Sequence, residues 1–180
     1  MNYRIAYLFR GKSKKYIEQL VKNVAKKFDV NYVYSGKQPA HITLKYRFET
    51  ENIKKVEKII AELCNDTKSS YFEIGGIGSF HKNTLHLKVK PSREMVKFEK
   101  ELIKKLNHFK ATLPQYNKHN QTLYKNFHVG IAHHDVTGKF DNIRNYMTKH
   151  DKRFKLKFDR VYLIKKPKNK WIIYKEYKIK

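Results

Sequence analysis

The chain has 180 residues, and its 41 Lys plus Arg against 16 Asp plus Glu give a formal net charge of +25. A hydrophobic share of 40% excludes a disordered chain, and the length favours one folding unit over two independent domains. The charge favours a polyanionic partner such as nucleic acid. However, lysines are spread over the whole chain, and biased codon usage would produce the same excess.

The sequence lacks the signals of disulfide-stabilised and membrane proteins. Cys64 is the only cysteine, which excludes a disulfide framework and a cysteine-based zinc site, and its place beside Leu63 on an expected helix indicates packing. No apolar stretch approaches the roughly 20 residues that a membrane span requires, and the N-terminus has too short an apolar core for a secretion signal. We therefore expect a cytoplasmic protein.

Strand-like and helical patterns take turns along the first third of the chain. Period-2 alternation predicts strands over residues 3–9, 31–35 and 40–48. Apolar residues at helical spacing predict a helix over 14–28 and a second helix over 53–63, for which Thr50 is the expected N-cap.

The rest of the chain continues this alternation. Paired strands are expected over 71–80 and 84–90 with a turn at 81–83, and Pro91 and Ser92 open the next helix. The polar segment 109–125 indicates a loop that is long enough to carry function. The remaining expected elements are a strand over 126–132, a helix over 139–149, strands over 154–166 and 170–179, and a turn at 168–170.

Two histidines lie on short apolar strands about half a chain length apart. His41 is followed two residues later by Thr43, and His128 by Gly130. Residues i and i+2 of a strand project from the same face, so each pair points one way while its apolar neighbours point into a core. If the two strands face a common cleft, two imidazoles flank one site.

Two imidazoles at one site suit phosphodiester chemistry without a metal ion. Near neutral pH, a neutral imidazole accepts a proton from the attacking water while a protonated one donates to the departing oxygen. The hydroxyl of Thr43 can donate a hydrogen bond to a non-bridging phosphate oxygen. The sequence leaves open which histidine is the base.

Four segments carry a resemblance to a known family, in order along nearly the whole chain: HITL (41–44), FEIGGIGSF followed by TLHLKVKPS (72–92), FHVGIA (127–132) and VYLIKKPKNKWIIYKEYKI (161–179). They resemble the two-histidine (2H) phosphoesterase superfamily, and within it the 2′,5′ RNA ligase and cyclic phosphodiesterase branch. The resemblance implies an α+β bilobal fold, with two antiparallel sheets related by pseudo-two-fold symmetry around a central cleft and with helices on the outside. Residues 1–180 would then form a single domain of two intertwined lobes.

The resemblance also implies an activity, namely hydrolysis of 2′,3′-cyclic phosphates to 2′-phosphates. Some members in addition join or cleave 2′,5′ linkages in RNA reversibly. The expected partner is an RNA or nucleotide with a cyclic phosphate end, and no cofactor is implied. We expect a monomer with no membrane contact, and no metal, because the remaining histidines show no convincing ligand spacing.

The second motif departs from the family pattern, which is H-x-T or H-x-S twice. Gly130 stands where a hydroxyl is expected, and a missing donor at a charged phosphate costs on the order of 10²-fold to 10³-fold in turnover if nothing replaces it. The backbone N–H of Gly130 or a water could replace it. Alternatively, the protein is slow, altered in substrate, or a non-catalytic binder.

Four further residues are weaker candidates for substrate binding. Phe80 could stack on a base at the rim of the cleft, and Lys45 points with His41 if its strand stays regular. Lys125 precedes the second motif and could contact phosphate. His133 occupies the place, five residues after His128, where the family usually has an arginine.

Together with the resemblance, these residues favour an RNA-end phosphoesterase with His41 and His128 as the acid/base pair and Thr43 as the phosphate ligand. A basic RNA-binding module that has lost catalysis on the same fold is the alternative. In a purely structural domain, both histidines would instead be buried and hydrogen-bonded to core groups.

Overall fold

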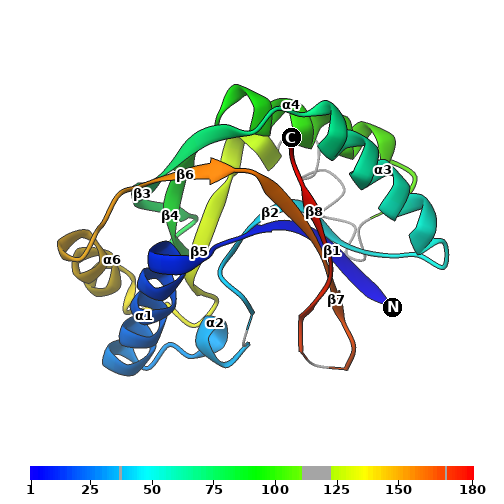
Figure 1. The fold of residues 1–180 in the computed structure, drawn as a ribbon. Coiled ribbons are helices and arrows are strands. Elements are labelled where there is room, and N and C mark those ends of the chain that lie inside the picture. The colour runs from blue at the N-terminus through cyan, green and yellow to red at the C-terminus, as the bar shows by residue number, and fades with distance from the viewer. Residues whose placement is uncertain (37, 111–122, 169) are drawn as a thin grey trace.

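The computed structural model describes residues 1–36, 38–110, 123–168 and 170–180. Two four-stranded antiparallel sheets form the centre of this part of the chain. Helices α3 (Ile53–Asp66) and α4 (Arg93–Lys105) lie together at one end, and α1 (Gly11–Phe28), α2 (Tyr32–Ser35) and α6 (Phe140–Lys149) gather at the other (Figure 1). This arrangement is the predicted bilobal α+β fold.

Each sheet carries one of the two histidine strands at its edge. The first sheet has the order β2-β1-β7-β8, formed by β2 (His41–Glu49), β1 (Asn2–Leu8), β7 (Arg160–Lys166) and β8 (Ile172–Lys178). The second has the order β5-β4-β3-β6, formed by β5 (His128–His133), β4 (Thr84–Lys90), β3 (Ser70–Phe80) and β6 (Phe154–Phe158). In both sheets, therefore, the histidine strand pairs with the strand that comes before it in the sequence: β2 with β1, and β5 with β4.

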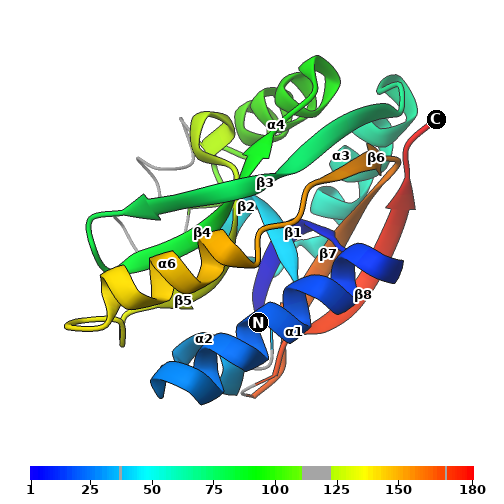
Figure 2. The same cartoon turned by 90° about the vertical axis from the view of Figure 1, so that its left-hand side faces the viewer.

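Two helices, α1 and α4, each follow a strand of one sheet but pack on the histidine strand of the other sheet. Helix α1 follows β1 of the first sheet but packs on β5 of the second, beside α6 (Figure 2). Helix α4 follows β4 of the second sheet but packs on β2 of the first. Each histidine strand is thus covered by a helix that follows a strand of the other sheet. The apolar positions of both strands are buried: Ile42 and Leu44 in β2, and Val129 and Ile131 in β5.

Most predicted helices and strands are present, because their apolar faces are strongly periodic. Helix α1 buries Ile17, Leu20 and Val24 on one face. Helix α4 begins after Ser92, as predicted, and the Ser92 hydroxyl accepts a hydrogen bond from the N–H of Met95. The turn at 81–83 joins β3 to β4.

Three sequence-based predictions of local structure are wrong. Residues 31–35 are not a strand: Tyr32–Ser35 form the short helix α2, whose first N–H donates to the carboxylate of Asp135. The N-cap of α3 is Asn52, which accepts from the N–H of Lys55, while the Thr50 hydroxyl accepts from the N–H of Asn52. In both cases a side-chain oxygen, the carboxylate of Asp135 or the amide oxygen of Asn52, accepts from a backbone N–H at the start of the helix. Residue propensities and apolar periodicity do not report such hydrogen bonds.

The third error concerns residues 154–166, which are two strands in different sheets. The break is at Asp159, whose carboxylate accepts hydrogen bonds from the side chains of Arg10 and Arg160. These ion pairs hold the chain where it passes from one sheet to the other.

Residues 111–122 of the predicted loop and Asn169 of the predicted turn lie outside the described residues. Leu123–Asn126 form a 3-10 helix. Among the described residues, no helix is long and apolar enough to cross a membrane.

Candidate active site

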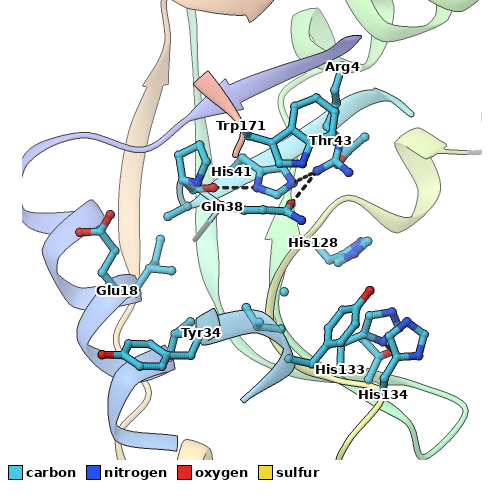
Figure 3. Close-up of a pocket in the computed structure, with 18 of the residues that line it drawn as sticks. Arg4, Glu18, Tyr34, Gln38, His41, Thr43, His128, His133, His134 and Trp171 are labelled. Carbon is cyan, nitrogen blue, oxygen red and sulfur yellow. Dashed lines mark hydrogen bonds between the residues drawn. The ribbon is translucent and has the colours of Figure 1, made fainter. Parts of the chain in front are cut away.

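A cavity of about 1290 Å³ is lined by residues of both sheets and of α1 and α2. His41 and Thr43 of β2 line it from one sheet, and His128 of β5 lines it from the other (Figure 3). Gly130 of β5 also lines the cavity. The two motifs that are far apart in the sequence thus face one cavity. Neither histidine is sealed in the core, as a purely structural domain would require.

The hydrogen bonds of His41 define its neutral tautomer. Its Nδ1 lies 2.8 Å from the carbonyl oxygen of Pro39, and its Nε2 lies 2.9 Å from Nη1 of Arg4. A carbonyl only accepts and a guanidinium only donates. Therefore Nδ1 carries the proton and Nε2 presents its lone pair toward Arg4.

His128 is held in the same way. Its Nδ1 lies 2.8 Å from the carbonyl oxygen of Asn126, so Nδ1–H donates and Nε2 is left for a ligand. In both motifs the histidine is the first residue of its strand and donates to the carbonyl two residues earlier. The pseudo-symmetry therefore extends from the fold to the ring orientation of both imidazoles.

The surroundings favour the neutral form of both rings, but not equally. Burial, with help from the nearby charge of Arg4, lowers the pKa of His41 to about 3. Burial also lowers the pKa of His128, and the hydrogen bond to Asn126 opposes this change. The shift is larger at His41, which faces a fixed cation.

Arg4 is a site residue that sequence reasoning missed. Its Nη1 also donates to Oε1 of Gln38 at 2.9 Å, and its guanidinium lies 4.7 Å from the ring centroid of Trp171. The available signal was its place on the first strand, between the buried residues Tyr3 and Ile5 and hence on the opposite face. That face becomes functional only because β1 pairs with the His41 strand.

Thr43 and Gly130 occupy equivalent positions in the two motifs. Thr43 lies opposite Ala6 in the β1–β2 pair, and Gly130 lies opposite His86 in the β4–β5 pair. A Cβ atom added to Gly130 would meet no atom within 4 Å. The site therefore has room for a side chain at position 130.

The expectation that Lys45 points with His41 and Thr43 is wrong, because β2 does not stay regular. A bulge leaves Thr43 opposite Ala6 but Lys45 opposite Ile5, so β2 has one extra residue there and its faces exchange. Tyr46 lines the cavity instead. Lys45 is only 2% exposed, its ammonium lies 5.4 Å from the ring centroid of Phe48, and burial lowers its pKa to about 8.

The other weaker candidates are divided between the cavity and the surface. Lys125 is exposed on the 3-10 helix and does not line the cavity. Phe80 lines it; the centroid of its ring lies 4.4 Å from that of His86 in a stacked arrangement and 4.9 Å from that of His128 in a T-shaped one. His133 lines it too, with Nδ1 2.6 Å from the Thr84 hydroxyl. Burial lowers the pKa of His133, so this residue does not supply the permanent charge of an arginine.

No group of three or more His, Cys, Asp or Glu side chains is arranged to hold a metal ion in the described part of the chain.

The profile of the 2′-5′ RNA ligase superfamily matches residues 12–170. The chain belongs to this superfamily. Solved structures of similar fold include the protein TT0787 of Thermus thermophilus, with 14% identity, a TM-score of 0.64, and 99% of this chain and 98% of that chain covered. The predicted membership of the two-histidine phosphoesterases is thereby confirmed.

Escherichia coli LigT has the superfamily fold as well. Its phosphate complex has 10% identity, a TM-score of 0.58 and coverage of 99% of this chain and 96% of that chain. Its complex with 3′-AMP has 9% identity, a TM-score of 0.56 and the same coverage. A search of curated protein sequences found no match to this chain.

Proposed function

We propose that this protein is an RNA-end phosphoesterase that hydrolyses a 2′,3′-cyclic phosphate to a 2′-phosphate. One observation carries the proposal: two imidazoles, both with Nδ1 held by the carbonyl two residues earlier, line one cavity from two equivalent strands. This arrangement leaves both Nε2 atoms for proton transfer on a phosphate placed between them.

In this proposal His41 is the general base and His128 the general acid. The oxygen of water bonds to phosphorus as the bond from phosphorus to the ribose O3′ breaks. Nε2 of His41 takes the proton of the water, and Nε2–H of protonated His128 gives a proton to O3′. The assignment follows the surroundings, because Arg4 and burial disfavour a charge on His41 more than burial alone disfavours one on His128.

Arg4 and Thr43 bind the phosphate oxygens. Nη1 of Arg4 contacts the nitrogen that has to meet the water, so its move to a phosphate oxygen would free Nε2 of His41 at the moment the substrate arrives. A guanidinium is well suited to this task, since it donates several hydrogen bonds in one plane. Thr43 donates from the same face of β2, two residues from His41.

RNA is the substrate class that the charge favours. A net charge of +25 attracts polyanions, and the cavity is lined by Phe80 and by the exposed Tyr32, whose rings can stack on bases. The LigT complexes with phosphate and with 3′-AMP support a phosphate group as the bound group. With a ribose hydroxyl in the place of water, the same two histidines would also catalyse reversible 2′,5′ ligation.

The test is incubation with an oligonucleotide that ends in a 2′,3′-cyclic phosphate, in the presence of a chelator. We expect a 2′-phosphate product, lost in His41→Ala and in His128→Ala and retained in His150→Ala, which changes an exposed histidine at the end of α6. Turnover that survives either active-site variant would overturn the proposal.

A non-catalytic RNA-binding module is the second candidate, favoured by Gly130 at the place of a hydroxyl. Salt-sensitive binding of the same oligonucleotide with no product would support it, because phosphate contacts weaken as salt rises.

A further inference from the structure

His86 lies on β4 between two glycines of the neighbouring strands. Its partner on β3 is Gly78, and its partner on β5 is Gly130. The imidazole lies on the Gly78 side, where an added Cβ would collide with Nε2 of His86. On the other side, at Gly130, an added Cβ would meet nothing within 4 Å. The space that a side chain at position 130 would occupy, beside the cavity, is thus open.

The present position leaves His86 unsatisfied. The residue is 6% exposed, and its Nδ1 is buried with no hydrogen-bond partner among the described residues. A buried polar atom without a partner is costly and needs a reason. Its ring lies 5.2 Å from the ring of His128 and is stacked under Phe80, so the unsatisfied group belongs to the surroundings of the proposed acid.

The two halves of the site differ in a complementary way. In the first half, Thr43 carries a hydroxyl and its cross-strand partner Ala6 carries only a methyl group. In the second half, Gly130 has no side chain and its partner His86 carries an imidazole. The Cβ atoms of directly opposite residues are about 4.5–5.5 Å apart, a distance that an imidazole ring spans. A donor is missing at one position, and a donor is present beside it.

We propose that His86 supplies the phosphate hydrogen bond that a hydroxyl at position 130 would make, by turning from Gly78 toward Gly130 when a phosphate occupies the cavity. This inference depends on the proposed function, because it requires a phosphate between His41 and His128. The neutral ring has a single N–H, which is enough for one non-bridging oxygen. His86 is then a third histidine of the active site that contacts the substrate.

The test is a double-mutant cycle of His86→Phe and Gly130→Thr with two readouts. The first is the Kd of a nucleoside 2′-monophosphate by calorimetric titration, and the second is turnover of the cyclic-phosphate oligonucleotide. Phenylalanine keeps the ring and its stacking on Phe80 but removes the N–H. We expect His86→Phe to weaken binding about 10-fold and to slow turnover by about 10²-fold to 10³-fold, as for a lost donor at a developing charge.

Gly130→Thr provides the decisive comparison, because it restores a hydroxyl in open space. In the Gly130→Thr background, we expect His86→Phe to change both readouts less than about 3-fold, since the donor is then redundant. Equal losses in both backgrounds, or no loss in either, would overturn the inference. His150→Phe is the matched control, with the same exchange on an exposed helix end.

Two further variants protect the test against misfolding. His86→Gln keeps a donor on a flexible chain and should retain more affinity than His86→Phe at an unchanged melting temperature. Gly78→Ala pushes the imidazole away from its present position, so the affinity for the monophosphate should hold or rise. A loss of affinity of about 10-fold in Gly78→Ala without a loss of stability would contradict the inference.

The readouts also separate this inference from the proposed function. If the effects of the two substitutions on the Kd are coupled but the protein shows no turnover, the proposed enzymatic function is overturned and His86 remains a phosphate ligand. Turnover in the wild type without coupling between the substitutions at positions 86 and 130 would overturn only the proposed role of His86. Absence of both binding and turnover in the wild type would overturn both.

Discussion

Nη1 of Arg4 lies 2.9 Å from Nε2 of His41, the atom to which we assign proton abstraction. The contact keeps a positive charge beside an imidazole that is already disfavoured as a cation by burial. It therefore ties the protonation state of the base to the position of one side chain, on a strand that carries no histidine.

Removal of Arg4 should raise the pKa of His41 from about 3 toward its ordinary value of 6.5. The reason is loss of the nearby cation, while the larger effect of burial remains. NMR titration of the imidazole in Arg4→Ala against the wild type measures the change, and turnover should fall about 10²-fold as the phosphate ligand is lost. Arg144→Ala, on the exposed face of α6, is the control. An unchanged or lower pKa would contradict the contact.

The pH dependence of kcat/KM should report both histidines of the free protein. Activity requires neutral His41 and protonated His128, so it falls on the alkaline side as His128 loses its proton and on the acidic side as His41 gains one. Both pKa values lie below 6.5 in the free protein, with that of His41 at about 3. The optimum of kcat/KM should therefore lie below pH 6.5, and that of kcat should lie higher, since bound phosphate favours both cations. An optimum of kcat/KM above about pH 8 would refute this assignment of roles.

Lys45→Met should stabilise the fold without affecting turnover. The ammonium is buried beside Phe48, and its pKa is lowered from 10.5 to about 8, so the folded state gives up this proton more readily than the unfolded state. The penalty is complete below pH 8 and fades as pH rises toward 10.5. Urea unfolding near neutral pH should show a gain of about 1–3 kcal/mol, which shrinks at about pH 10. A loss of turnover of more than about twofold would show that Lys45 does contribute to the active site.

Gly130→Thr should be accepted by the fold and raise its stability. Glycine in a strand interior is destabilising by roughly 0.5–1 kcal/mol relative to alanine, and β-branched residues suit strands. The added atoms meet nothing within 4 Å, so no neighbour has to move. Denaturant unfolding should show a gain of about 0.5–1 kcal/mol. A marked loss of stability would show that position 130 is glycine for a steric reason.

The sequence by itself determined the features that follow from spacing along the chain. His41 with Thr43, and His128 with Gly130, share a strand face because side chains alternate with a period of two. Helices α1 and α4 follow from apolar periodicity, and Ser92 caps α4 because a hydroxyl at that position accepts from the N–H three residues on. These are local properties, and no partner strand is needed to state them.

The tertiary structure alone decided which residues meet. Arg4 reaches His41, and His86 lies opposite Gly130, only because of strand pairing and register. The bulge between Thr43 and Lys45 of β2 moved Lys45 into the core and brought Tyr46 to the cavity. Likewise, the break at Asp159 depends on Arg10, which is distant in sequence. Register, bulges and ion pairs between distant segments depend on long-range contacts, which the periodicity of one strand does not encode.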